Sequence, residues 1–234
     1  EEKVIAKDGV YVLSGIRLFV PYAHVADWLV YDARTTEGST LFLISAKQPG
    51  VKCTVLPSIA SDKQCEVTLD NVMVPEGNIL GQRGQGQEML STIGEWAAVA
   101  CCGFILGGLG RVLEMTVEYA KERIQFDRPI GSFQAVQHQC ADMLMDVDAT
   151  KFLTYQAAWE IGQQVKATNE VSLAKARAGA ASRRVCLLGV KIHGGVGMME
   201  IHDMSLYFKK LKAAEVTFGG EDFHREIIAQ QLGL

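Results

Sequence analysis

Residues 119–130 read YAKERIQFDRPI, and residues 133–137 read FQAVQ. The break at residues 127–129 is expected to end a helix, because the proline and the residue before it disfavour helical backbone. The lysine and arginine before the break allow two interpretations. They complement the negative C-terminal end of the helix dipole, or Arg123 extends beyond the helix to bind a phosphate, with Phe126 offering an aromatic face nearby.

A helical bundle is predicted on both sides of this break. Residues 87–123 contain no proline and carry apolar residues on most faces, which predicts a long, largely buried helix. After the break we expect helices over 132–164, 169–192, 203–212 and 221–232, with Ser132 as the N-cap of the first of them. The glycines of the long helix each cost about 1 kcal/mol relative to alanine, so we expect them to pack closely against a neighbouring helix.

The first eighty residues predict β structure. Short β-prone runs recur at roughly ten-residue spacing, separated by turn sequences such as Asp8-Gly9 and Pro49-Gly50. The composition changes after Pro75, where several glycines follow. The predicted fold class is α+β: a small antiparallel β-barrel or sandwich over residues 1–80, incomplete at its start, followed by an antiparallel helical bundle over residues 81–234.

Composition excludes several classes of function. The chain has 23 Lys+Arg and 27 Asp+Glu, a net charge of −4, so we expect no nucleic-acid binding and no binding to a membrane. The six cysteines form no Cys-x-x-Cys pair and the five histidines show no metal-ligand spacing, which predicts reduced, mostly buried thiols and no metal site. Reduced thiols indicate the cytoplasm, or the mitochondrial matrix if the source is eukaryotic.

Several segments, in the same order, resemble the acyl-CoA dehydrogenase family. Residues 123–126 with the following Phe-Gln resemble its Arg-x-Gln-Phe-Gly…Phe-Gln signature, and residues 192–197 resemble the Gly-Gly-x-Gly loop that receives the ADP part of FAD. Residues 8–15, 23–27, 66–75 and 80–86 resemble its middle β domain. The resemblance covers essentially the whole chain. It implies an FAD enzyme that oxidises an acyl-CoA thioester to the 2,3-enoyl-CoA, and a further N-terminal helical domain beyond these residues.

The resemblance also implies a set of FAD-binding residues. They are Phe19, Arg123, Gln125, Phe126, Gln134, Lys191, Gly194 and Gly195. Lys191 stands where the family commonly has a glutamine, and Phe19 takes the aromatic position beside the flavin ring. Pro21 follows that position and has no N–H, so a flavin hydrogen bond is expected to be lost there.

The catalytic base departs from the family pattern. By alignment its usual glutamate position is Phe218, and a phenyl ring cannot abstract a proton. Some family members place the base on the long helix instead, at the position of Glu95, and this glutamate is our candidate base; the alternative is an ordinary surface glutamate. The resemblance implies substrate contacts by Trp96, Phe218 and Gly219, with the backbone N–H of Phe218 supporting the thioester oxygen.

Three functional hypotheses remain open from the sequence. The first is an active FAD-dependent acyl-CoA dehydrogenase with Glu95 as base. The second is a non-catalytic or partner-dependent subunit of a heteromeric acyl-CoA dehydrogenase, and the third is a family member with different flavin or CoA chemistry. The resemblance implies an acyl-CoA substrate, an electron-transferring flavoprotein as oxidant, and assembly into a homodimer or homotetramer.

Overall fold

The computed structural model describes residues 3–7 and 9–234. The chain divides into two compact units, Glu1–Ile93 and Gly94–Leu234. Asp8 of the predicted Asp8-Gly9 turn lies outside the described residues.

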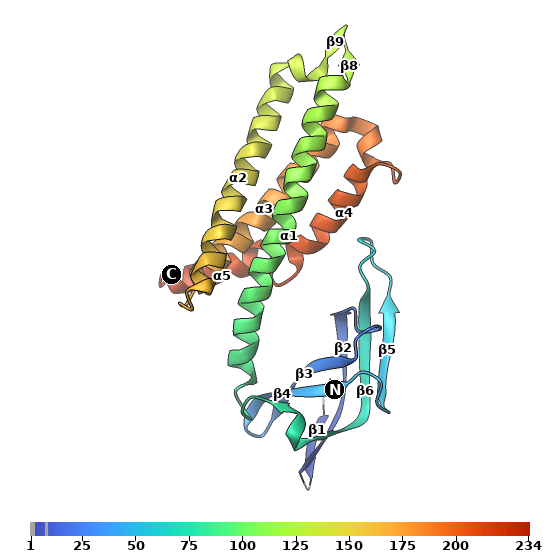
Figure 1. The fold of residues 1–234 in the computed structure, drawn as a ribbon, viewed down its shortest axis with the longest axis vertical. Coiled ribbons are helices and arrows are strands. Elements are labelled where there is room, and N and C mark those ends of the chain that lie inside the picture. Colours follow the sequence, from blue (N-terminus) through green and yellow to red (C-terminus); the bar gives the residue numbers. More distant parts are fainter. Residues whose placement is uncertain (1–2, 8) are drawn as a thin grey trace. The chain divides into compact units, whose positions relative to one another are not determined.

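The first unit contains two antiparallel sheets, which are drawn in blue and cyan in Figure 1. The four-stranded sheet has the order β1 (Lys3–Lys7), β2 (Val10–Pro21), β6 (Gln64–Pro75) and β5 (Val51–Leu56). The three-stranded sheet has the order β3 (Trp28–Thr35), β4 (Gly38–Ser45) and β7 (Ile79–Leu80), and a 3₁₀ turn, η1 (Glu76–Asn78), precedes β7. The predicted antiparallel β structure is confirmed.

The core of this unit follows from the two-residue period of its strands. Tyr11 and Leu13 of β2 are buried, as are Val67 and Leu69 of β6, while residues between them are more exposed. The Tyr11 ring also contacts the fully buried Phe42 of β4, with 5.0 Å between ring centroids. These side chains join the two sheets around one apolar core.

The second unit is the predicted helical bundle (Figure 1). Its helices are α1 (Gly86–Glu122), which begins in the first unit, α2 (Gln134–Gly162), α3 (Thr168–His193), α4 (Asp203–Val216) and α5 (Glu221–Gln231). The hairpin β8 (Ile124–Gln125) and β9 (Arg128–Pro129) and the turn η2 (Ile130–Ser132) connect α1 to α2, and η3 (Gly194–Met198) follows α3. The mixed α+β fold is therefore confirmed.

The start of α2 differs from the prediction. Ser132 lies in η2, and its Oγ donates to the carbonyl oxygen of Pro129 at 2.7 Å. The N-cap residue of α2 is Phe133, which makes no side-chain capping hydrogen bond. The prediction of Ser132 as N-cap was wrong because its hydroxyl is used in the preceding turn, a common alternative for serine near a helix start.

The glycines of α1 mostly do not serve helix packing. A Cβ added to Gly108 would lie 2.6 Å from Cδ2 of Leu211 in α4, so this glycine does permit a close approach. The added Cβ would have no described neighbour within 4 Å at Gly94, Gly103, Gly107 and Gly110. The expectation of close packing was right at Gly108 and wrong at these four positions.

This difference predicts opposite effects for two alanine substitutions in one helix. Gly108→Ala should lower the free energy of unfolding by about 1–3 kcal/mol, because the new methyl group overpacks the buried Leu211. Gly103→Ala should raise it by about 1 kcal/mol through helix propensity alone. Urea denaturation of both variants measures the effects, and equal changes of the same sign would contradict the packing difference.

Helix α1 is long and apolar enough to cross a membrane, judged by length and composition alone. In this structure Ile105, Leu109 and Val112 of α1 are fully buried in the apolar core of the second unit, beside residues of α2, α3 and α4. Only 33% of the most apolar window of α1 is buried, and Trp96 and Phe104 are exposed, so the prediction of a largely buried helix was right for its length and wrong for its burial.

The six cysteines are all free. Cys65, Cys101, Cys102 and Cys186 are buried, and burial raises the pKa of the Cys102 and Cys186 thiols to about 12. They act as small apolar core residues, as predicted. Cys53 in β5 and Cys140 in α2 are partly exposed.

Candidate functional site

A tight hairpin places Arg123 at the end of α1. The hairpin loop is Phe126-Asp127, and both residues have positive φ, +53° and +64°. This is the backbone of a type I′ turn, which suits the twist of a two-residue hairpin but is disfavoured for a large side chain such as phenylalanine. The strand pairing brings the chain back at once, so that Ile130 N–H donates to Arg123 O at 2.8 Å.

A glycine turn at the end of α3 faces this hairpin. Gly194 has φ +66° and ψ −145°, which strongly favours glycine. A Cβ added to Gly194 or Gly195 would have no described atom within 4 Å. The backbone of this turn is therefore open to a ligand.

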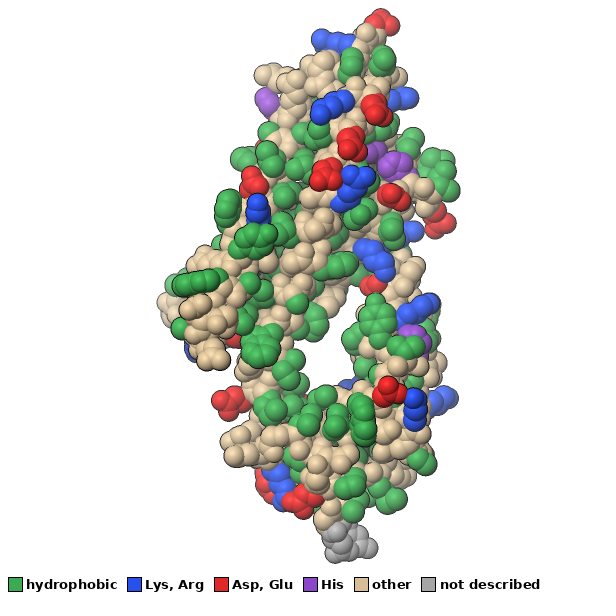
Figure 2. Space-filling view, in the orientation of Figure 1, with side chains coloured by type: hydrophobic (Ala, Val, Ile, Leu, Met, Phe, Trp, Pro, Cys, Tyr) green, Lys and Arg blue, Asp and Glu red, His purple; other side chains and the backbone are tan. Residues whose placement is uncertain are grey.

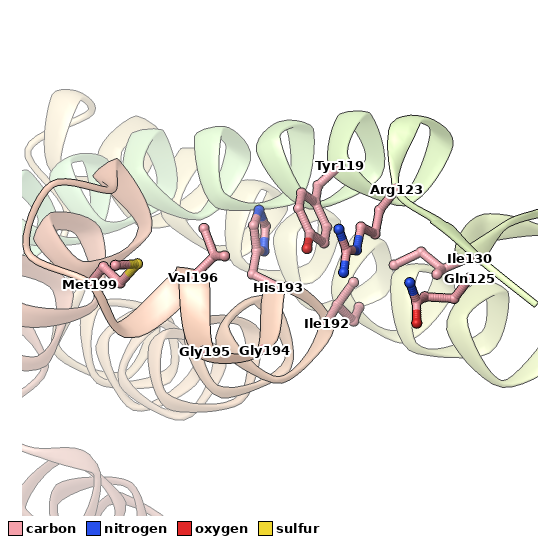
Figure 3. A pocket seen from close by; sticks show the side chains of 10 residues that line it. All are labelled: Tyr119, Arg123, Gln125, Ile130, Ile192, His193, Gly194, Gly195, Val196 and Met199. Carbon is pink, nitrogen blue, oxygen red and sulfur yellow. The ribbon is translucent and has the colours of Figure 1, made fainter.

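The two segments line one cavity of about 660 Å³. Figure 3 shows the side chains of Tyr119 and Arg123 pointing from α1 toward the end of α3, with Gly194 and Gly195 on the adjacent turn. Gln125 also lines the cavity. Four residues predicted from the resemblance, Arg123, Gln125, Gly194 and Gly195, are thus brought together by the fold.

The guanidinium of Arg123 is exposed, and it forms no hydrogen bond or ion pair with any residue in the described part of the chain. A cation held beside an open glycine backbone can pair with an anionic oxygen ligand without first breaking an internal ion pair. The planar fork of arginine favours bidentate contacts to phosphate.

Among the cavity residues that sequence reasoning missed is an aromatic pair, Tyr119 and His193. Their rings stack with 4.4 Å between centroids and an angle of 22°. His193 is buried, its Nδ1 lies 2.8 Å from Gly189 O, and burial lowers its pKa. Both residues lie inside motifs quoted from the sequence, and this position was the one sign that they belong to the site. Only the fold shows that their rings are in contact.

This arrangement fits the ADP part of FAD. The cavity offers an unpaired guanidinium, a backbone turn whose glycines leave room for a ligand, and a stacked aromatic pair in its wall. Each of these features suits a phosphate-bearing, partly aromatic ligand.

The other predicted cofactor residues lie elsewhere. Phe126 is 86% exposed and packs edge-to-face on Phe133, with 6.0 Å between ring centroids. Gln134 is exposed at the start of α2, and Lys191 is exposed on α3. Phe19 belongs to the first unit, where it has φ +60° beside a β-bulge in β2 and is 69% exposed.

Glu95 on α1 is half-buried and hydrogen-bonded to α3. The hydroxyl of Thr168, the first residue of α3, donates to Glu95 Oε1 at 2.6 Å. Glu95 Oε2 has no hydrogen-bond partner within the described ranges. The carboxylate is therefore oriented through one oxygen and leaves the other available. The neighbouring Trp96 is 59% exposed.

Phe218 and Gly219 lie in the loop between α4 and α5. Phe218 is 51% exposed and has φ +58°, and Gly219 has φ +98°. A Cβ on Gly219 would lie 2.4 Å from the Phe223 ring, so no other residue fits this position without rearrangement. Within the described residues, no hydrogen bond or ion pair joins this loop to Glu95.

Comparison with known proteins agrees with the fold. Residues 84–233 match the family model described as "Acyl-CoA dehydrogenase, C-terminal domain". Acyl-CoA dehydrogenase FadE27 of Mycobacterium tuberculosis is 35% identical over 230 residues, which cover 95% of this chain and 61% of that protein.

Two solved structures extend the comparison. The ChsE4-ChsE5 complex from Mycobacterium tuberculosis matches with a TM-score of 0.91 and 34% identity over 99% of this chain and 62% of that one. "PigA with FAD and proline" matches with a TM-score of 0.95 and 27% identity over 100% of this chain and 63% of that one.

The chain spans about three fifths of the length of these relatives. The family to which they belong carries out flavin-dependent dehydrogenation or reduction. The family model covers most of the chain, and the relatives cover both of its units. The chain therefore belongs to the acyl-CoA dehydrogenase family.

Proposed function

We propose that the protein is an FAD-dependent dehydrogenase subunit that oxidises acyl-CoA thioesters to 2,3-enoyl-CoA. The observation that carries this proposal is the unpaired guanidinium of Arg123 beside the open Gly194-Gly195 turn in one cavity. When bound, FAD would supply the acceptor for the hydride that leaves the substrate β-carbon.

The residues of the cavity would bind and orient the cofactor. Arg123 would pair with the pyrophosphate, because its fork can donate two parallel hydrogen bonds to phosphate oxygens. The open turn at Gly194 lets the backbone approach the same group closely. The stacked rings of Tyr119 and His193 supply a flat wall with little conformational freedom.

Glu95 is the proposed base for the substrate α-proton. Its Oε1 is fixed by Thr168, and its Oε2 is the oxygen that would accept the proton. A carboxylate held in this way needs little reorganisation at the moment of reaction. Phe218, at the usual base position, can contribute backbone N–H and apolar surface only.

A second candidate function is a partner-dependent subunit. The observation in its favour is Phe218 at the position where the family usually carries its catalytic glutamate. In this case the chain would hold part of the cofactor site, and a related chain would supply the base.

Bleaching of the flavin by substrate distinguishes the two candidate functions. The full-length protein with FAD is mixed anaerobically with a panel of acyl-CoAs, and Glu95→Gln should slow the reduction of the flavin by about 10²–10⁴-fold. Glu88→Gln, an exposed glutamate on the same helix, is the matched control and should change nothing. Subsequent addition of an electron-transferring flavoprotein, the proposed oxidant, should restore the flavin colour.

Each outcome has a clear meaning. Equal bleaching in the wild type and in Glu95→Gln would exclude Glu95 as base. Bleaching that requires an added related chain would favour the second candidate. Product formation without net flavin reduction would favour different flavin or CoA chemistry.

We further propose that the protein assembles with a second copy through α2. Large apolar side chains project from the face of α2 opposite its buried residues, and Figure 2 shows hydrophobic side chains along this helix. Those that define the face are Met145, Phe152, Tyr155 and Trp159, each between 58% and 68% exposed. A cluster of exposed large apolar side chains on one helix face is typical of an interface.

Charges placed on this face should dissociate the assembly. The double variant Phe152→Asp, Trp159→Asp is expected to have the mass of a single chain by light scattering, because buried, unpaired carboxylates are costly. Lys151→Glu, on an exposed position of the same helix, should keep the wild-type mass. A monomeric wild-type protein would refute the assembly.

A further inference from the structure

The loop between α4 and α5 has an unusual backbone that needs external support. Phe218 and Gly219 are consecutive residues with positive φ, +58° and +98°. A phenylalanine disfavours this conformation and keeps it only where its surroundings impose it. The hydrogen bonds around the loop identify the side chains that hold Phe218 in this conformation.

Lys175 of α3 is the first support. Its side chain is fully buried, and its Nζ donates to Glu215 O at 2.9 Å and to Gly219 O at 2.8 Å. The ammonium thus joins the last turn of α4 to the loop, where a cation also complements the negative end of the helix dipole. A fully buried lysine is rare and calls for a specific role.

His224 of α5 is the second support. Its Nε2 lies 2.9 Å from Phe218 O, and its Nδ1 lies 3.3 Å from Ser172 Oγ. A carbonyl can only accept, so Nε2 carries the proton and Nδ1 accepts from the Ser172 hydroxyl. Burial lowers the pKa of His224, which favours this neutral form.

These two side chains also fix where the loop N–H groups point. In a planar trans peptide the C=O of one residue and the N–H of the next point in opposite directions. Phe218 O and Gly219 O are turned toward His224 and Lys175, so the N–H groups of Gly219 and Gly220 point away from them. Within the described part of the chain, the N–H groups of Phe218, Gly219 and Gly220 have no acceptor.

We infer that Lys175 and His224 are positioning residues that hold this loop so that its free N–H groups can donate to the thioester oxygen of the substrate. The inference rests on the proposed function, because removal of the α-proton places negative charge on that oxygen. Donors fixed in advance at such an oxygen lower the barrier without reorganisation. Neither side chain needs to touch the substrate.

The test uses the full-length protein with FAD and an acyl-CoA that carries ¹³C at the thioester carbonyl. Infrared difference spectra should show the bound carbonyl stretch at lower frequency in the wild type. Lys175→Met and His224→Leu should lose most of this shift and slow single-turnover flavin reduction by about 10²-fold. Substrate affinity should change less than threefold, because the N–H contacts strengthen chiefly as charge develops.

Two matched variants separate positioning from a general loss of structure. His224→Gln keeps a side-chain N–H near the place of Nε2, so it should restore the carbonyl shift that His224→Leu loses. Lys151→Met removes an exposed lysine and should behave as wild type. If Lys175→Met does not fold, the two His224 variants decide the question alone.

Failure of the positioning role and failure of the proposed function give different results. A wild-type shift that persists in Lys175→Met and His224→Leu would overturn the positioning role and leave the proposed function intact. A wild-type protein that retains FAD but shows neither carbonyl shift nor bleaching with any acyl-CoA would overturn the proposed function, and this inference with it.

Discussion

Arg123→Met should release FAD from the protein. The variant removes the only side-chain cation that lines the cavity at the end of α1, as far as the described residues extend, apart from the weakly basic His193. Two charge-assisted hydrogen bonds to phosphate are worth about 1.5–3 kcal/mol each. Their loss should raise the Kd for FAD by about 10²–10⁴-fold, measured as flavin absorbance retained after gel filtration and by titration of the apoprotein.

Arg111→Met is the control for this prediction. Arg111 lies on the same helix, is exposed, and forms an ion pair with Glu114 one turn away, at 3.0 Å. Its removal should leave the Kd for FAD unchanged. If both variants retain FAD equally well, the cavity at Arg123 is not the cofactor site.

Asp146→Asn should cause a large loss of stability. Asp146 is buried in α2, and its carboxylate accepts from Arg177 at 2.6 Å and from Arg184 Nε at 2.9 Å, both on α3. Removing its charge leaves two arginines facing a neutral amide. The free energy of unfolding should fall by roughly 3 kcal/mol, the lower end for a broken buried pair, because both arginines keep some access to water.

Urea denaturation measures this loss, and Asp148→Asn is the matched control. Asp148 is exposed on the same helix, two residues along. Its substitution should change stability by less than about 0.5 kcal/mol. A loss below 1 kcal/mol for Asp146→Asn would show that the ion pairs join α2 to α3 without stabilising the fold.

The helices were the most predictable part of the fold. The stretch over residues 87–123 predicted α1 (Gly86–Glu122) almost to the residue, because it lacks proline and ends at a proline-containing break. The predicted 169–192 helix likewise matches α3 (Thr168–His193). The start of α2 was predicted wrongly because the hydroxyl of Ser132 donates to a carbonyl oxygen of the preceding turn instead of capping the helix. Local backbone geometry, and not the residue type, decides between these two hydrogen bonds.

The packing of glycines and the short strands could not be predicted in the same way. Gly108 and Gly103 have the same residue type in the same helix, and only the position of Leu211 distinguishes them. The strands β7, β8 and β9 are two residues long, so their sequences show no alternation of apolar and polar residues. They are recognised as strands only by their pairing with a neighbouring strand.

The residues of the candidate site could be predicted where they belong to short contiguous sequence motifs. Arg123, Gln125, Gly194 and Gly195 were named from such motifs, and the fold gathers them around one cavity. Lys175 gave no sequence signal, because lysines are usually exposed and its role depends on carbonyls of residues 215 and 219. The pairing of Tyr119 with His193 likewise exists only once α1 and α3 lie together.

The distribution of the thiols gives the protein a built-in pair of labelling positions. Four cysteines are shielded in the cores, whereas Cys53 lies partly exposed in the first compact unit and Cys140 partly exposed in the second. A thiol-specific spin label or fluorophore will therefore attach preferentially at one point in each unit. The distance between the two units, and its change when a nucleotide or thioester is added, can be followed by double electron–electron resonance in the unmodified sequence.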